Sequence, residues 1–206
     1  MPSFALERAA GSGEVLVAGI DEAGRGPLAG PVVAAAVVFE RPKLPRELAR
    51  AIDDSKQLTG AERRRLAPLI AAHGRVGIGW ASVGEIDSIN ILRASLLAMR
   101  RAMEQLDVTP AIALVDGNVP PPLHCPVRTV VDGDSLSLSI AAASIIAKVT
   151  RDRIMTGLGY AYPGYGWQHN AGYGTPEHQA AIGRLGLTPQ HRRSFRPISQ
   201  LTLPNI

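Results

Sequence analysis

The sequence predicts a single α/β domain built on a mixed β-sheet. Apolar runs typical of strands alternate with segments of helical periodicity, and the first two runs are too close together to enclose a helix. With 206 residues and 46% hydrophobic content, the chain can form one substantial core and is short for two. We expect a domain over residues 15–196, with a C-terminal helical and loop appendage over about 157–196 and flexible tails at 1–14 and 197–206.

The apolar runs predict five strands. Residues 15–20 are apolar without alternation, as in a strand covered on both faces. Residues 32–39 follow after a short turn, which predicts an antiparallel neighbour, because parallel neighbours need a longer crossover. The remaining runs are 76–81, 111–115 and 127–131. The proline-rich segment 117–126 is long enough, when extended, to run back along a short strand, so the first, fourth and fifth strands could be parallel.

Other segments predict helices that cover this sheet. Thr59-Gly60-Ala61-Glu62 has the spacing of a capping box and begins one helix. Apolar residues recur every three or four positions over residues 89–106, which indicates an amphipathic helix with one face on the sheet. Residues 135–155 are apolar nearly all round, which indicates a deeply buried helix.

Acidic residues follow three of the predicted strands. Asp21 and Glu22 come directly after the first strand, Asp116 follows the fourth, and Asp134 lies shortly after the fifth. If these strands are parallel, their carboxyl ends share one edge of the sheet. Carboxylates without histidine or thiolate suit Mg²⁺ or Mn²⁺, and such a set could hold two ions that activate water against a phosphodiester. The pattern therefore predicts phosphodiester hydrolysis.

Each acid also has a simpler interpretation. Asp134 precedes a predicted helix and could be its N-cap, while Asp116 could be an ordinary turn residue. Asp21 and Glu22 could share a proton instead of binding a metal ion, although acids beside a buried strand carry a desolvation cost that needs compensation. Asp132 is interpreted as an exposed turn residue.

The glycine-rich segment 24–30 matches the G-x-G-x-x-A pattern of a dinucleotide-binding turn. That pattern requires a helix to follow, whereas Pro31 and a valine-rich strand follow here, so this interpretation is rejected. The Gly24-Arg25-Gly26 turn could instead bring backbone close to a nucleic-acid strand while the guanidinium contacts phosphate. Alternatively, its glycines only shape a tight turn.

The charge of the chain is concentrated at its C-terminal end. No acid follows Glu177, and the net charge of +4 equals the number of arginines after it, which are Arg184, Arg192, Arg193 and Arg196. Such a patch fits a polyanionic partner or a solvated basic tail. No apolar stretch reaches the roughly 18 residues that span a bilayer, and the single Cys125 cannot form an internal disulfide. We expect no membrane association and a cytoplasmic location.

Ordered motifs over most of the chain carry a family resemblance. They are residues 18–33, 54–58, 85–87, 90–92, 116–117, 133–134, 141–152, 172–175 and 191–195. With these motifs the chain resembles bacterial ribonuclease HII. The resemblance implies a ribonuclease H-like fold, in which helices flank a five-stranded mixed sheet and a helical extension follows. It also implies an endonuclease that cleaves the RNA strand of RNA/DNA hybrids and nicks duplex DNA 5′ to embedded ribonucleotides, leaving 3′-hydroxyl and 5′-phosphate ends.

The resemblance further implies a role for particular residues and partners. The catalytic metal ligands would be Asp21, Glu22, Asp116 and Asp134, holding two Mn²⁺ or Mg²⁺ ions when substrate is bound. The ribose 2′-hydroxyl at the RNA–DNA junction would be read by Gly24, Arg25, Gly26 and Tyr173, and phosphates would be contacted by Lys56 and Lys148. The partners would be RNA/DNA hybrid and ribonucleotide-containing duplex DNA, and we expect a monomer.

Three positions depart from the family pattern. Asp132 stands where a basic or small residue is common, Gln57 replaces a frequent second lysine, and Asn170-Ala171 replaces a usual His-Lys. None is one of the predicted metal ligands, so we expect the departures to affect affinity more than chemistry. Two other functions remain open, namely a junction resolvase-type nuclease and a non-catalytic nucleic-acid-binding module.

Overall fold

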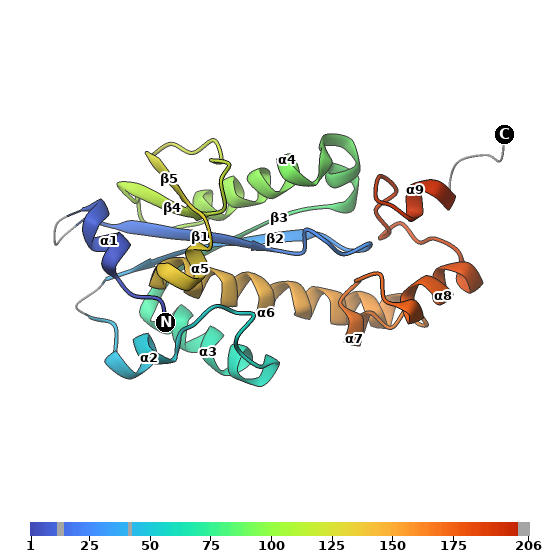
Figure 1. Cartoon of the computed structure of the whole chain (residues 1–206), viewed down its shortest axis with the longest axis horizontal. Helices are drawn as coiled ribbons and strands as arrows, with labels where there is room; N and C mark the ends of the chain where they lie inside the picture. The colour runs from blue at the N-terminus through green and yellow to red at the C-terminus, as the bar shows by residue number, and fades with distance from the viewer. Residues whose placement is uncertain (12–14, 41–42, 202–206) are drawn as a thin grey trace.

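A five-stranded sheet in the order β3-β2-β1-β4-β5 forms the centre of the molecule (Figure 1). The computed structural model describes residues 1–11, 15–40 and 43–201. The strands are β1 (Val17–Ala23), β2 (Val32–Phe39), β3 (Gly74–Ala81), β4 (Ile112–Asp116) and β5 (Val127–Val130). β2 runs antiparallel to β1 and β3, whereas β1, β4 and β5 are parallel. The predicted mixed sheet and its strand directions are confirmed.

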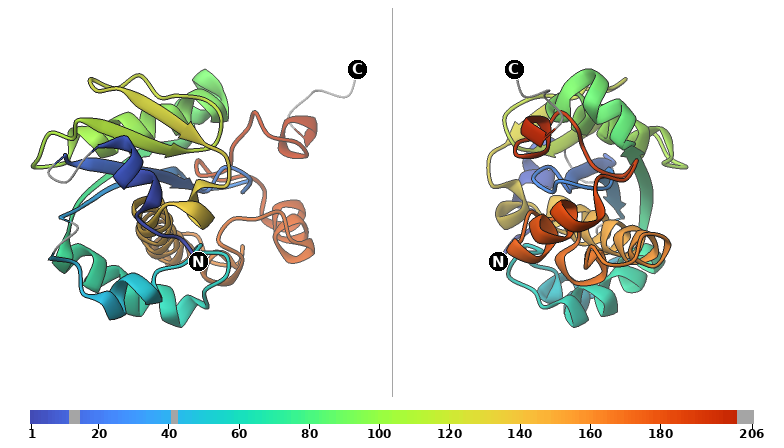
Figure 2. Two further views of the ribbon diagram at one scale, coloured as in Figure 1. Left: turned by 60° about the vertical axis from the view of Figure 1, so that its left-hand side comes forward. Right: turned by 90° about the vertical axis from the view of Figure 1, so that its right-hand side faces the viewer.

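Helices cover both faces of this sheet (Figure 2). On one face lies α6 (Leu138–Ala161), with α2 (Arg46–Ala51) and α3 (Gly60–His73) outside it, and on the other lies α4 (Val83–Glu104). The backbone of α6 crosses β1 at Gly19, where an added Cβ would lie 2.2 Å from the carbonyl carbon of Ser139. Only glycine therefore allows this contact, which sets how deeply α6 packs beside the predicted acids.

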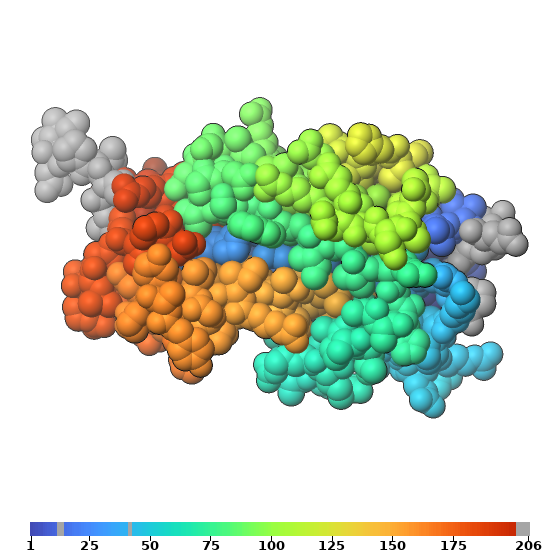
Figure 3. Space-filling model, turned by 180° about the vertical axis from the view of Figure 1, so that it is seen from behind, coloured from blue at the N-terminus to red at the C-terminus, as the bar shows by residue number. Residues whose placement is uncertain are grey.

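From behind, α4 and α6 flank a strip of the sheet that remains visible between them (Figure 3). Edge strand β3 is only partly covered, because Ile78 and Trp80 are 39% and 53% exposed. The alternating small residues of β3 face the opposite way, and an added Cβ at Gly77 would lie 2.0 Å from the carbonyl oxygen of Ala102 in α4. The glycines of β3 thus allow α4 to pack directly on strand backbone.

The predicted helices are present, with different bounds. The capping box that begins at Thr59 is formed at the start of α3. The predicted helix over 135–155 begins only at Leu138, because residues 133–136 form the separate turn α5 (Gly133–Leu136). α4 begins earlier than expected and is interrupted at Asn90, which has φ 68° and accepts a hydrogen bond from the Arg93 amide.

Both ends of the chain differ from the flexible tails expected from the sequence. Residues 5–10 form α1 (Ala5–Ala10), and the buried Glu7 accepts hydrogen bonds from the Ser137 hydroxyl and the Ser139 amide. At the other end, α7 (Trp167–Asn170), α8 (Pro176–Leu185) and α9 (Ile198–Leu201) follow α6, and Ile198 is fully buried. Residues 12–14 and 202–206 of the expected tails lie outside the described residues. None of the described helices is long and apolar enough to cross a membrane.

Candidate active site

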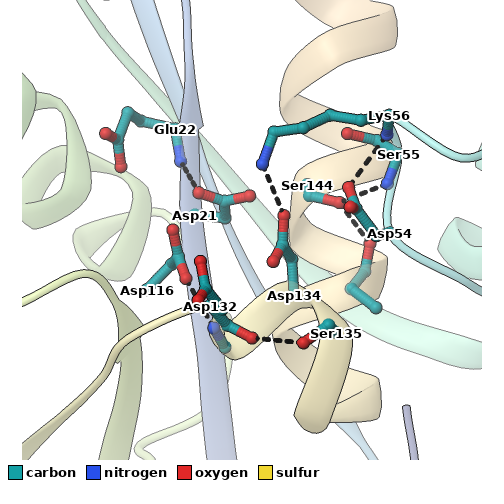
Figure 4. A network of polar contacts seen from close by, with 12 residues as sticks. Asp21, Glu22, Asp54, Ser55, Lys56, Asp116, Asp132, Asp134, Ser135 and Ser144 are labelled. Carbon is teal, nitrogen blue, oxygen red and sulfur yellow. Dashed lines mark hydrogen bonds and ion pairs between the residues drawn. The ribbon is translucent and has the colours of Figure 1, made fainter. Parts of the chain in front are cut away.

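The predicted acids meet at one edge of the sheet, where the parallel strands end (Figure 4). Asp116 is the last residue of β4, and Asp134 lies in α5 just beyond β5. Asp21 and Glu22 were expected directly after a strand, but they lie within β1, which continues to pair with β2 after β4 has ended. The edge is nevertheless shared, because Ile20 pairs with Val115 and the next residue on each strand is an acid.

Of the predicted acids that line the cavity described below, Asp21 is the most deeply buried. Its exposed fraction is 6%. Burial raises the pKa of Asp21 well above its usual value, and the neighbouring charges of Glu22, Asp116 and Asp134 raise it further. Its Oδ1 accepts a hydrogen bond of 2.7 Å from the Glu22 amide, which opposes that rise. The Asp21 carboxylate is therefore held in place by this bond, although its surroundings on balance disfavour its negative charge.

The neighbouring acids show the same need for a cation. Burial raises the pKa of Glu22, although the Arg25 guanidinium 3.2 Å from its Oε1 opposes the shift. Burial also raises the pKa of Asp116, whose Oδ1 accepts a hydrogen bond of 2.7 Å from the Gly133 amide. Because both shifts disfavour the ionised form, a divalent cation beside these carboxylates would relieve desolvation and mutual repulsion together.

Asp134 is held differently, through a lysine from another segment. Its Oδ2 accepts a 2.9 Å hydrogen bond from the Lys56 ammonium, and this bond raises the pKa of Lys56 (Figure 4). Asp134 is not the N-cap that one interpretation allowed, because it lies inside α5 and Asp132 occupies the capping position. Asp132 is exposed, as predicted, and its side chain makes no cap hydrogen bond.

A cavity of about 300 Å³ opens beside these acids. It is lined by Asp21, Glu22, Ala23, Gly24, Arg25, Gly26, Ser55, Lys56, Arg63, Asp116, Ser144, Lys148, Arg151 and Tyr173. These residues include every predicted metal ligand except Asp134 and every predicted substrate contact. The structure therefore brings together segments that are as much as 152 residues apart, since both Asp21 and Tyr173 line the cavity.

The donor set suits a hard divalent cation better than zinc. The acids that line the cavity offer carboxylate oxygens, and its lining contains no histidine or cysteine. Within the described residues, no three acidic, histidine or cysteine side chains already stand at metal-binding distances. The Lys56 and Arg25 cations and the Gly133 amide engage some of these oxygens instead. The carboxylates are thus chemically suited to Mg²⁺ or Mn²⁺. To bind such an ion, their side chains would have to turn toward it and away from their present partners.

The predicted ribose-reading residues lie side by side. Gly24 has φ +98°, and a Cβ there would lie 2.0 Å from the Arg151 Nε, so this position requires glycine. A Cβ at Gly26 would meet only the Tyr173 ring, at an ordinary 3.7 Å. Tyr173 is 47% exposed at the cavity mouth. The glycine turn and the tyrosine therefore form one wall of the cavity, with the ring free to contact a sugar.

The predicted lysines both line the cavity but have different surroundings. The Lys148 ammonium lies 2.6 Å from Asp152, four residues along α6, and its side chain is 28% exposed. The Lys56 side chain is 76% exposed apart from its contact with Asp134. The sequence did not reveal Arg63, which lines the same cavity and donates to the backbone carbonyl of Ser55. Its position in a run of three arginines gave no sign that it differed from its neighbours.

A buried cluster of aromatic and histidine side chains is hydrogen-bonded to the loop that carries Tyr173. His178 Nδ1 bonds to the Tyr173 carbonyl oxygen at 2.8 Å, and its Nε2 accepts from the Trp167 indole at 2.9 Å. His191 Nδ1 accepts from the Thr188 amide, which leaves Nε2–H to face His178 at 3.2 Å. Both histidines are therefore neutral in this arrangement. The sequence offered no signal for this cluster, because its members are scattered over the appendage.

This cluster predicts a loss of stability at mildly acidic pH. Burial, and then the repulsion that arises when His178 is also protonated, lowers the pKa of His191 from 6.5 to about 4. Between these values the unfolded chain takes up a proton that the folded chain does not, so stability is present above pH 6.5 and is lost as pH falls. Urea unfolding should show a loss on the order of 3 kcal/mol attributable to this group.

The matched comparison for this prediction uses His191→Gln and His73→Gln. His73 is exposed at the end of α3, so its replacement removes a histidine without disturbing the cluster. His73→Gln should keep the pH dependence of the free energy of unfolding between pH 7 and pH 4, whereas His191→Gln should reduce it and leave the smaller part that comes from the lowered pKa of His178. Equal slopes in both variants would contradict the prediction.

The departures from the family pattern are explained in part. Asn170, the first residue of the Asn170-Ala171 departure, shapes the loop before Tyr173 by donating to the Tyr165 carbonyl and accepting from the Gly172 amide. Gln57 is exposed and lies beside Lys56. The basic C-terminal patch is smaller than expected, because Arg192 is fully buried while the other predicted members are exposed.

Comparisons with known proteins show which proteins this chain is similar to. The family model described as Ribonuclease HII matches residues 18–198. Ribonuclease HII of Paramagnetospirillum magneticum is 58% identical over 203 residues, which cover 98% of this chain and 100% of that protein. Among solved structures, ribonuclease H2 of Pyrococcus horikoshii OT3 superposes with a TM-score of 0.75 at 28% identity, covering 91% of this chain and 97% of that chain. Bst-RNase HIII in complex with Mn²⁺ has a TM-score of 0.77 at 21% identity, covering 93% and 70%, and shares the fold.

The family match includes all the predicted acids and the whole glycine turn. The predicted ribonuclease H-like fold is confirmed by its similarity to ribonucleases H2 and HIII. The family model and the high identity to a full-length relative lead to one conclusion. The chain belongs to the ribonuclease HII family of hydrolytic endonucleases.

Proposed function

We propose that this protein cleaves the RNA strand of RNA/DNA hybrids and nicks duplex DNA on the 5′ side of embedded ribonucleotides. The products would carry 3′-hydroxyl and 5′-phosphate ends. The observation that supports this proposal is the shared cavity, which is lined by Asp21, Glu22 and Asp116 together with the Gly24-Arg25-Gly26 turn and the exposed Tyr173. A site that only binds nucleic acid has no use for carboxylates beside a polyanion.

In this proposal, one group of residues contacts the sugar and another contacts the phosphates of the substrate. The glycine turn and Tyr173 contact the sugar at the RNA–DNA junction, where the 2′-hydroxyl distinguishes RNA from DNA. Lys56 and Lys148, which line the same cavity, contact phosphates, and Arg63 adds a further cation. These contacts fix the register of the strand, so that a particular phosphodiester lies against Asp21.

The acids supply a binding site for divalent cations. Asp21, Glu22, Asp116 and Asp134 would hold two Mn²⁺ or Mg²⁺ ions when substrate is bound. Such ions, when bound, lower the pKa of water and stabilise the leaving oxygen of an in-line displacement. The same fold in Bst-RNase HIII forms a complex with Mn²⁺. Lys56 would then leave Asp134 for the substrate phosphate, because its long exposed side chain moves at little cost.

The organisation of the chain fits a self-contained enzyme. We infer that residues 15–196 act as one catalytic domain, with the segment after α6 as an appendage that supports Tyr173. A monomer would suffice, because β1, α3, α6 and the loop that carries Tyr173 all reach the same cavity from one chain.

A panel of substrates tests the proposed function. The purified protein with Mg²⁺ or Mn²⁺ should cut an RNA/DNA hybrid and a DNA duplex with one embedded ribonucleotide, and the new ends should be a 3′-hydroxyl and a 5′-phosphate. It should leave an all-DNA duplex and a four-way DNA junction intact. Cleavage of the four-way junction alone would favour a resolvase, whereas metal-independent binding without cleavage would favour a non-catalytic binding module.

A further inference from the structure

Arg192 is a fully buried arginine that donates hydrogen bonds into the glycine turn. Its Nη2 donates to the Gly24 carbonyl at 2.6 Å, its Nη1 to the Arg25 carbonyl at 2.9 Å, and its Nε to the Gly30 carbonyl at 2.9 Å. Within the part of the chain that the structure describes, no carboxylate forms an ion pair with it. A buried guanidinium is costly unless its N–H groups are satisfied, and here the loop carbonyls satisfy them.

The orientation of these carbonyls fixes the orientation of two amides. A trans peptide unit is planar, so its N–H points away from its C=O. Because the Gly24 and Arg25 carbonyls face Arg192, the amides of Arg25 and Gly26 face the other way. No hydrogen bond from either amide occurs among the described residues, and all residues of the turn line the cavity. The turn thus presents two free N–H groups on its side away from Arg192.

Arg192 is itself anchored on several sides. Its amide donates to the Leu28 carbonyl at 2.8 Å, and its guanidinium stacks 5.0 Å from the centre of the Phe195 ring. The next residues are fixed to α4, because the Asp87 carboxylate accepts hydrogen bonds from the amides of Arg193 and Ser194. The C-terminal segment therefore connects α4 to the glycine turn through a guanidinium that has little freedom to move.

We propose that Arg192 is a positioning residue for recognition of the ribose at the RNA–DNA junction. It holds the Arg25 and Gly26 amides toward the substrate, where they bond to an oxygen of the sugar or its phosphate. This role rests on the proposed function, because it assumes that the turn reads a ribonucleotide. Arg192 does not touch the substrate, and its effect passes entirely through the backbone of the turn.

The nearby Arg151 shows why Arg192 is specific to this role. Arg151 is also buried and donates to carbonyls, but its acceptors are Pro31, Ala29 and Ala171. Its hydrogen bonds therefore hold the segment that precedes β2 and the loop that carries Tyr173, and none of them goes to a peptide unit of the turn itself. Replacing Arg192 should therefore weaken recognition of the ribose more than it changes the positions of the carboxylates.

The experiment measures preference for a ribonucleotide, separately from turnover. Fluorescence anisotropy compares binding of a DNA duplex that has one embedded ribonucleotide with binding of the matching all-DNA duplex, in an Asp21→Asn background that prevents cleavage. Arg192→Lys keeps the charge, but its donors lie on one nitrogen, whereas the three carbonyls are bonded by three separate nitrogens of the planar guanidinium. It should lower the ratio of the two affinities by about tenfold, and in the cleaving protein it should raise KM more than it lowers kcat.

Two further variants complete the test. Phe195→Leu removes the ring beside the guanidinium but keeps Arg192, so it should give a smaller loss of preference and remains informative if Arg192→Lys does not fold. Arg100→Gln removes an exposed arginine of α4 and should keep the full preference. The inference is overturned if folded Arg192→Lys or, failing that, folded Phe195→Leu binds with the same preference as Arg100→Gln. Absence of any preference in the protein with Arg192 intact would overturn the proposed function, and this inference with it.

Discussion

Asp21→Asn is expected to lower kcat for a ribonucleotide-containing duplex by roughly 10³-fold or more, in saturating Mg²⁺ or Mn²⁺. Asparagine keeps the size of the side chain and the oxygen that accepts the hydrogen bond from the Glu22 amide. It removes the negative charge that lies deepest among the acids lining the cavity. The measurement is single-turnover cleavage, which separates the chemical step from product release.

The same substitution should stabilise the protein when no divalent ion is present. Because burial and neighbouring acids raise the pKa of Asp21 in the folded state, its ionisation costs stability at neutral pH. That cost vanishes below the unfolded pKa of 3.8 and grows as pH rises through the folded value. Asp21→Asn should therefore unfold at a higher temperature than the unsubstituted protein at pH 7 and lose this advantage near pH 4.

Asp107→Asn is the matched control for both measurements. Asp107 is an exposed acid, 65% accessible, that pairs with Arg75 away from the cavity. It should retain cleavage and change thermal stability little, since exposed ion pairs contribute about 0–1 kcal/mol. Divalent ions should raise the melting temperature of Asp107→Asn more than that of Asp21→Asn. Full cleavage by Asp21→Asn would remove the basis for the proposed mechanism.

The sequence was sufficient to predict which edge of the sheet carries the acids. The runs before Asp21 and Asp116 are apolar without alternation, which is typical of central strands, and parallel central strands place their ends together. Asp21 and Glu22 were predicted to follow the first strand, but they lie within β1. β1 is paired on both sides, and its antiparallel partner β2 extends beyond the end of β4, so the strand continues through the acids.

The supporting contacts could not be predicted, because they join distant segments through polar side chains. Lys56 and Asp134 are 78 positions apart, and Arg192 and Gly24 are 168 apart. Hydrophobic periodicity locates elements but says nothing about which arginine of a basic stretch is buried. Arg192 was counted in a solvent-facing basic patch for this reason, although its guanidinium belongs to the interior.

Gly24→Ala is expected to abolish selective cleavage at a ribonucleotide and to destabilise the protein. The added Cβ would lie 2.0 Å from the Arg151 Nε and 2.4 Å from its Cδ, and φ is +98°, which alanine adopts only with strain. Arg151 cannot move aside easily, because its guanidinium is buried and bonded to the carbonyls of Pro31, Ala29 and Ala171. The turn must therefore shift, and kcat/KM should fall by about 100-fold or more.

Gly26→Ala separates the strain at Gly24 from a general intolerance of the turn. Its Cβ would meet only the Tyr173 ring at 3.7 Å, and its φ is not in the left-handed region. We therefore expect thermal unfolding of Gly26→Ala close to that of the unsubstituted protein, while Gly24→Ala loses about 2 kcal/mol or more. Equal stability of the two variants would show that Arg151 yields to the methyl group. In that case Arg151 would not rigidly limit the space beside Gly24, and any remaining loss of cleavage would have to come from direct contact of the turn with substrate.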